Sequence, residues 1–169
     1  MLLVCKRLPA TEETLEFLSP FIGQKHIQAG INDEWRTPYG MYTLFSDIRT
    51  GKYRCYGVFE LDDKGTVQRF LGFEMGELDL SGHGIEHHAF WDRHVPVKAC
   101  LDLCRELATK EFAAEGVAIT KFVCFVPDCG RAVRRLAFRY GCRDCGLVPN
   151  RVFRKNGKKY PCRMFVFNV

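Results

Sequence analysis

The 169-residue chain lacks several features that would place it in a large class of proteins at once. It has no apolar run near the ~20 residues that a membrane-spanning helix needs. It also has no internal repeat and no low-complexity segment. The apolar run that starts at Met1 is too short for a signal peptide. These absences predict one soluble, cytoplasmic domain over residues 1–169, with no membrane partner and enough length for a hydrophobic core.

The chain also lacks the paired cysteine motifs of a structural zinc site. It has nine cysteines, but only Cys142 and Cys145 have the spacing of a zinc knuckle. A structural zinc site usually needs two such knuckles, or one knuckle with paired histidines. We therefore expect no metal site. Because no secretion signal is present, the cysteines should be reduced, with Cys100, Cys104 and Cys124 as buried free thiols.

A strong net charge is missing as well, since the formal charge is only +5. The basic residues concentrate late in the chain, where two interpretations are open. They face the phosphates of a cofactor or of nucleic acid, or they form a solvated helix face and a basic loop. No nucleic-acid-binding motif accompanies them, so a nucleic-acid partner is the weakest expectation. The cluster comprises Arg131, Arg134, Arg135, Arg139, Arg143, Arg151, Arg154, Lys155, Lys158 and Lys159.

The hydrophobic pattern of the first half alternates between strand and helix periods. Thr11 is a plausible helix N-cap, with acidic residues in the first turn behind it. Residues 23–46 mix glycine, proline and aromatic residues, and we expect only short helical turns and loops there. From residue 52 the period becomes two, which is typical of β-strands. The pattern predicts strands at 2–8, 53–61, 67–75 and 85–91, the last three as an antiparallel meander.

The second half predicts a regular alternation of helices and strands. Residues 97–115 place apolar side chains on one helical face, and Gly116 is a natural residue to end that helix. Residues 119–126 are apolar on both faces, as expected for a central strand of a covered sheet. A helix at 130–140 and strands at about 142–152 and 161–169 should complete an α/β (α+β) domain of order β-α-β-β-β-α-β-α-β-β.

This element order resembles the GNAT family of N-acetyltransferases over most of the chain. Gly72, in the segment 69–73, lies where strands of the family often carry glycine. Residues 131–142 are similar to the family's last helix and its Gly-Phe ending, with Cys142 in place of phenylalanine. The resemblance implies a mixed, mostly antiparallel central sheet flanked by helices. It also implies an acyl-CoA site in which strand 119–126 splays from the strand that ends near Trp91.

The implied activity is acetyl transfer from acetyl-CoA to an amine acceptor, either a small molecule or a peptide. The cofactor loop departs from the family pattern, because Pro96 and Lys98 occupy two glycine positions counted from Arg93. Arg93 or Lys98 would then supply charge in place of amide donors. The alternative is a catalytically inactive GNAT-like binding or assembly protein, of a kind that also occurs in phage genomes. The expected cofactor contacts are Trp91, Arg93, Val97, Lys98 and Arg131.

Acetyl transfer needs a base for the amine and an acid for the leaving thiolate. Glu86 and His88 are candidates for the base, since strict alternation would place them on one strand face. The tyrosine that commonly serves as acid in the family is replaced by Ala137. Tyr140, three residues later, is the remaining candidate acid if the helix is shifted, whereas a core role is the favoured interpretation. The aromatic residues Trp35, Tyr39 and Tyr42 form either an acceptor pocket or a lid over the core, and a homodimer is one expected assembly.

Overall fold

The computed structural model describes residues 2–79 and 81–169, and the side chains of residues 85–90 lie outside that description. The N-terminal elements are β1 (Leu2–Leu8), α1 (Glu12–Ile22), α2 (Lys25–Gln28), the 3₁₀ helix η1 (Asp33–Arg36) and α3 (Pro38–Arg49). The central elements are β2 (Arg54–Leu61), β3 (Val67–Leu78), β4 (Gly84–Trp91) and α4 (Val97–Ala114). The C-terminal elements are β5 (Lys121–Pro127), α5 (Arg131–Arg139), β6 (Arg143–Lys155) and β7 (Lys158–Asn168).

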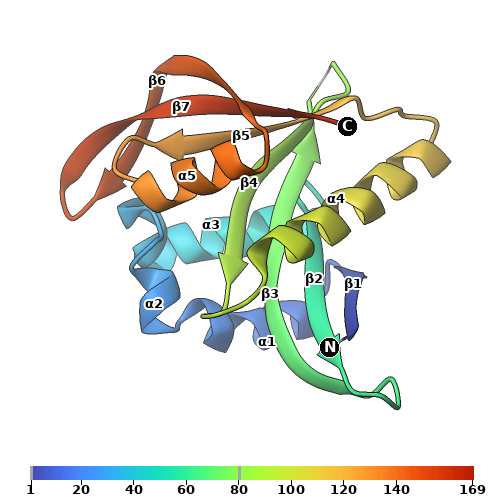
Figure 1. The fold of residues 1–169 in the computed structure, drawn as a ribbon. Coiled ribbons are helices and arrows are strands. Elements are labelled where there is room, and N and C mark those ends of the chain that lie inside the picture. The colour runs from blue at the N-terminus through green and yellow to red at the C-terminus, as the bar shows by residue number, and fades with distance from the viewer. Residues whose placement is uncertain (1, 80) are drawn as a thin grey trace.

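One seven-stranded sheet with the order β1-β2-β3-β4-β5-β7-β6 organises the chain. Each neighbouring pair is antiparallel except β4 and β5, which are parallel. The predicted mixed, mostly antiparallel sheet is therefore confirmed. Figure 1 shows α1, α2 and α3 behind the sheet, whereas α4 and α5 lie in front of it.

The period-two pattern of the strands sends alternate side chains to the two faces of the sheet, where two large cores form beside a smaller one around Phe165 of β7. On the side of α1 and α3, Phe73 and Met75 of β3 pack with buried Leu18 and Leu44. On the opposite side, Val58 and other residues of β2 and β3 pack under α4. The Cys100 and Cys104 side chains belong to this second core, as predicted from the apolar face of the helix.

The prediction for residues 23–46 was wrong in one respect, because α3 is a twelve-residue helix. Thr37 caps it through its hydroxyl, which accepts a hydrogen bond from the Gly40 amide at 3.0 Å. Pro38 occupies the first turn, where a missing N–H costs little. Gly40 lets the helix approach η1 closely, since a Cβ there would lie 1.8 Å from the Glu34 carbonyl oxygen. The sequence shows these helix signals, but the surrounding glycine, proline and aromatic residues obscured them.

The strands β6 and β7 are longer than predicted and form a hairpin that extends beyond β5 (Figure 1). Asn156 and Gly157 form its turn with positive φ angles of 51° and 73°. Two successive positive φ values are typical of the type I′ turn that Asn-Gly favours. No helix in residues 2–79 and 81–169 is long and apolar enough to cross a membrane.

Candidate functional site

The two halves of the sheet separate between β4 and β5. These strands pair only at residues 84–86 and 122–124. Beyond that point, β4 continues along β3 to Trp91, and β5 continues along β7 to Pro127. The predicted splay of these two strands is confirmed. The sheet therefore has a V-shaped gap whose closed end is the short parallel pairing.

A bulge interrupts β4 next to this gap. His88 pairs with Met75 and Glu86 pairs with Gly76, so one residue of β4 has no counterpart in β3. The prediction that Glu86 and His88 share one strand face assumed strict alternation of the side chains. The bulge breaks that alternation between the two residues. The side chains of Glu86 and His88 lie outside the described part of the structure, so their catalytic roles stay a prediction.

The N-terminus of α4 follows the far end of β4. The loop begins at Asp92, whose amide donates to the Leu71 carbonyl at 2.8 Å, and it contains His94 with a positive φ of 61°. Pro96 precedes the helix and gives no side-chain cap, and the Val97 amide donates to the Val95 carbonyl at 2.9 Å, so it is the later amides of the first turn that lack a side-chain cap. Amides and the helix dipole at such an end attract anions.

The predicted cofactor residues fall into two groups. Trp91, Arg93, Val97 and Lys98 all lie at this end of β4 and α4, where Arg93 and Lys98 are exposed. The Lys98 ammonium forms an ion pair with Asp102 at 2.7 Å. Arg131 instead begins α5, in the C-terminal segment that carries β5, β6 and β7. A positively charged side chain therefore lies in the first turn of both helices, Lys98 in α4 and Arg131 in α5.

Tyr140 ends α5 and packs in a core cluster with buried residues such as Val126 and Phe165, while two cations of α4 lie beside its ring. The Lys98 ammonium and the Arg105 guanidinium carbon lie 5.1 and 5.6 Å from the centre of its ring. The hydroxyl is buried and has no hydrogen-bond partner among the described residues. Burial, followed by the charge of Asp102, raises the pKa of the Tyr140 hydroxyl well above its ordinary value. The group is therefore a protonated hydrogen-bond donor at neutral pH.

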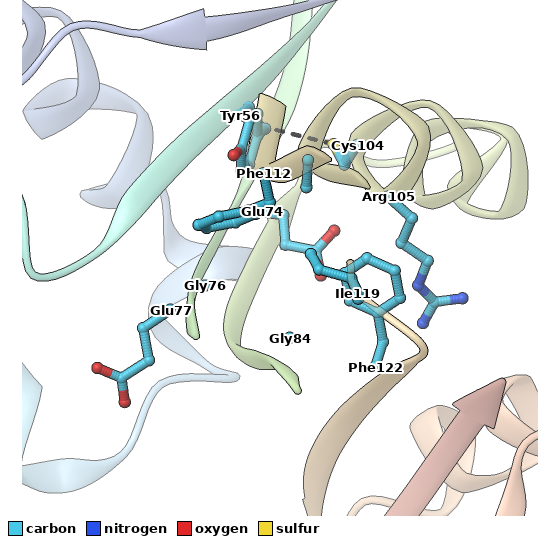
Figure 2. A pocket seen from close by; sticks show the side chains of 11 residues that line it. Tyr56, Glu74, Gly76, Glu77, Gly84, Cys104, Arg105, Phe112, Ile119 and Phe122 are labelled. Carbon is cyan, nitrogen blue, oxygen red and sulfur yellow. Dashed lines mark hydrogen bonds between the residues drawn. The ribbon is translucent and has the colours of Figure 1, made fainter. Parts of the chain in front are cut away.

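A small cavity of about 20 Å³, room for about one water molecule, lies under the C-terminal half of α4. Glu74 of β3 and Arg105 of α4 line it, and both residues are buried despite their charge. Figure 2 shows both side chains reaching into the same space, whereas Glu77 points away from them. The Arg105 guanidinium carbon lies 4.6 Å from the centre of the Phe167 ring.

Sequence reasoning missed the burial of Arg105, although a signal for it exists. Arg105 follows Leu101 by four positions and precedes Ala108 by three, so it falls within the apolar stripe of the helix. An arginine within such a stripe is either paired or stacked when it is buried. The structure shows it stacked near aromatic rings of β5, β7 and Tyr140.

A set of polar contacts, which we call the clasp, joins η1 to the tip of the β6–β7 hairpin. The Asp33 carboxylate accepts hydrogen bonds from the Asn156 and Gly157 amides, each at 2.9 Å. The Arg154 amide donates to the Asn32 side chain at 3.2 Å, and its guanidinium lies 3.4 Å from Glu34. The clasp thus links the helical layer under β1–β4 to the opposite arm of the V-shaped gap.

The electrostatics of the clasp favour an ionised Asp33. The Gly157 and Asn156 amides lower the pKa of the Asp33 carboxyl, with smaller contributions from nearby arginines. A carboxylate that accepts two amide hydrogen bonds is stabilised in its charged form. The clasp is therefore formed at neutral pH and is weakened only in acid.

The cysteines and aromatic residues were predicted with mixed success. All nine cysteines are thiols outside any disulfide, Cys100 and Cys104 are buried, and Cys124 is only half-buried. Burial raises the pKa of the Cys100 thiol to about 11, which makes it a poor nucleophile. Among the described residues, no group of three or more potential ligands is placed to hold a metal ion.

The aromatic residues Trp35, Tyr39 and Tyr42 do not pack together in one place. Trp35 packs against the core under α1 and α3, whereas Tyr39 and Tyr42 are 80% and 63% exposed. The interpretation of all three residues as a lid over the core is therefore wrong for the two tyrosines. Their role in binding an acceptor stays a prediction.

Several solved structures with a similar fold are acetyltransferases. The Salmonella typhimurium enzyme that modifies the N-terminal serine of a 50S ribosomal subunit protein is 13% identical, with a TM-score of 0.69 and coverage of 98% of this chain and 95% of that one. The spermidine N-acetyltransferase of Vibrio cholerae, solved with CoA and spermine, is 13% identical, with a TM-score of 0.66 and coverage of 98% and 95%. A Desulfovibrio desulfuricans protein described as GNAT is 10% identical, with a TM-score of 0.67 and coverage of 99% of each chain.

Comparison at the level of sequence gives no further assignment. No protein-family model matches the chain, and no curated protein matches it. The similarity to the solved structures therefore concerns the fold.

Proposed function

Because the chain has the GNAT acetyltransferase fold, we propose that it is an acetyl-CoA-dependent N-acetyltransferase. The observation that carries this proposal is the separation of β4 and β5 in front of the N-terminus of α4. Beyond residue 86, the backbone N–H and C=O groups on the β5 side of β4 have no partner in β5. They could form hydrogen bonds with the extended pantetheine arm of acetyl-CoA. The helix N-terminus at the same end suits the pyrophosphate.

In the proposed cofactor site, basic side chains replace part of the backbone amides that would otherwise bind the phosphates. Pro96 has no N–H to donate, so the phosphates depend on the amides of the first turn and on Arg93, Lys98 and Arg131. Trp91 and Val97 would contribute apolar contacts at the end of β4. Contacts of exposed side chains with phosphates are screened over a Debye length of about 8 Å at physiological ionic strength. The affinity for acetyl-CoA should therefore be modest and should fall as salt is added.

Tyr140 is the proposed acid for the leaving group. The acceptor nitrogen forms a bond to the thioester carbon, the carbon–sulfur bond breaks, and the sulfur takes the Tyr140 proton. Glu86 or His88 would accept the proton that the amine loses. Tyr140 is protonated at neutral pH, and the positive charge of Arg105, 5.6 Å from the centre of its ring, would stabilise the phenolate that remains after the transfer. Its buried hydroxyl without a described partner is consistent with a group whose partner arrives with the substrate.

The proposed acceptor is a small or peptide amine. Spermidine and the N-terminal serine of a ribosomal protein are acceptors of two proteins with this fold. The exposed Tyr39 and Tyr42 on α3 would offer aromatic surface for such a ligand.

The second candidate is a GNAT-like module without turnover. Pro96 and Lys98 at two family glycine positions, together with Ala137 at the family tyrosine position, favour it. This candidate differs from the first in a measurable way, because it predicts a folded protein that does not bind acetyl-CoA.

Titration calorimetry with acetyl-CoA at low and moderate salt tests the proposed function. We expect binding that weakens with salt, and weaker binding for the Arg93→Ala and Lys98→Ala variants. Transfer of labelled acetyl groups to spermidine and to a short serine-initiated peptide would then identify the acceptor class. No heat at either salt, with protein shown to be folded by circular dichroism, would refute the enzyme and leave the non-catalytic module.

A further inference from the structure

Positive charge is concentrated around α5 to an extent that the proposed chemistry does not use. Residues 128–143 contain five arginines and a single acidic residue, Asp128, which gives them a net charge of +4. The whole chain carries +5. Arg134 lies 3.3 Å from Asp128, so this pair neutralises one of the five arginines. The remaining charge belongs to Arg131, Arg135, Arg139 and Arg143.

Three of these arginines share one face of the helix. Arg131, Arg135 and Arg139 are each four positions apart, so they follow one stripe about 12 Å long. All three side chains are exposed. Among the described residues, no acidic side chain lies within ion-pair distance of them. Like charges at this spacing destabilise an isolated helix, so the stripe gives the fold no stability of its own.

An exposed aromatic ring lies on the same face. Phe138 follows Arg131 by seven positions and precedes Arg139 by one, so helical geometry places it beside the stripe. Its side chain is 57% exposed, and one edge of the ring contacts Phe165 at a centroid distance of 5.5 Å. Only Ala137 of α5 is fully buried. The outward face of α5, which we call the arginine face, therefore combines Arg131, Arg135, Arg139 and Phe138.

We propose that the arginine face of α5 binds nucleic acid through its sugar-phosphate backbone. The charges are all arginine, whose planar guanidinium matches phosphate oxygens in bidentate geometry and stacks on bases. An exposed ring among arginines is the combination that binds single strands with little sequence preference. A free cofactor would need only one or two of these charges, whereas a polyanion can contact the whole stripe.

Fluorescence anisotropy with a labelled 20-nucleotide single-stranded RNA, measured from 50 to 300 mM salt, tests the proposal. The decisive variant is Arg135→Ala/Arg139→Ala, which leaves the candidate cofactor residue Arg131 in place. Each phosphate contact to a single strand contributes about 0.7 to the slope of log affinity against log salt. Loss of two contacts should therefore lower the slope by about 1.4 and weaken binding more than tenfold at low salt.

Two further variants separate a specific face from general charge. Arg135→Lys/Arg139→Lys should keep the slope and lose only part of the affinity, because the charge remains and the bidentate geometry is lost. Arg49→Ala/Lys64→Ala removes the same charge from α3 and the β2–β3 turn, and its RNA binding should be unchanged apart from a small electrostatic effect.

Equal losses in this control and in the Arg135→Ala/Arg139→Ala variant would overturn the proposal in favour of non-specific attraction. No RNA binding by the wild-type protein at 50 mM salt would also overturn it. So would binding to anionic lipid vesicles or polyglutamate with no measurable affinity for RNA. Acetyl-CoA titration of the same variants is an independent measurement, so failure of the proposed enzyme function is distinguishable from failure of this surface.

Discussion

Replacing Tyr140 with phenylalanine should change stability and transfer in opposite directions. The variant removes only a hydroxyl that is buried and lacks a described hydrogen-bond partner. Leaving such a group unsatisfied costs a folded protein about 1–3 kcal/mol. Tyr140→Phe should therefore unfold at a higher temperature. At roughly 2–4 °C per kcal/mol for a chain of this size, the rise should be at least about 2 °C.

The same substitution should slow acetyl transfer. A positioned general acid contributes roughly 10²- to 10⁴-fold to the rate, so kcat should fall by at least about 100-fold. Binding of acetyl-CoA should change little, because the proposed phosphate contacts are Arg93, Lys98, Arg131 and the first-turn amides of α4, and the Tyr140 hydroxyl is not among them. Thermal unfolding by circular dichroism and single-turnover transfer measure the two effects on the same preparation.

Tyr56→Phe is the matched control. The Tyr56 hydroxyl is also buried, but it lies 3.0 Å from a Glu111 carboxylate oxygen. A hydrogen bond to a charged group contributes roughly 1.5–3 kcal/mol, so this variant should unfold at a lower temperature. If Tyr140→Phe were destabilised as much as Tyr56→Phe, the hydroxyl would have a partner and the reasoning would fail. Unchanged transfer in Tyr140→Phe would remove Tyr140 from the proposed mechanism.

Three further predictions concern charge, the clasp and the thiols. Lys98→Ala should weaken acetyl-CoA binding several-fold at low salt and much less at high salt, whereas Cys145→Ala should not change it; calorimetry distinguishes the two. Asp33→Asn should speed hydrogen exchange at residues 156–157. In the wild type the same loosening should occur only below about pH 4, because the pKa of Asp33 is lowered from 3.8 and its contribution is lost as the pH falls through the lowered value. Denaturation without reductant, followed by alkylation and mass spectrometry, should find nine reactive thiols; fewer would indicate disulfides.

Much of the fold could be predicted because its signals are local. Strand alternation and the helix at 97–115 each depend on residues close together in the sequence. The splay of β4 from β5 is a long-range feature, and only the resemblance to a known family suggested it. α3 was missed because Gly40, a residue that disfavours helices, is required there by close packing against Glu34.

The candidate site was less predictable for a physical reason. A bulge of one residue in β4 changes the faces on which later residues lie, and nothing in the residues 84–91 marks its position. The burial of Arg105 depends on aromatic rings from β5, β7 and the end of α5, which only the tertiary structure brings together. Tyr140 was predicted as either an acid or a core residue, and the structure shows that its ring and its hydroxyl have different environments.

The clasp has a consequence for the thermodynamics of any ligand in the gap. The pairing of β4 with β5 joins the two halves of the sheet at one place, and the contacts of Asp33 join η1 to the hairpin turn at a second place. The hairpin is therefore held at both places before a ligand arrives. The conformational entropy of ordering the hairpin is lost during folding, so it does not count against binding. A ligand that fits the existing width gains affinity from this preorganisation, whereas a wider one has to break the Asp33 contacts first.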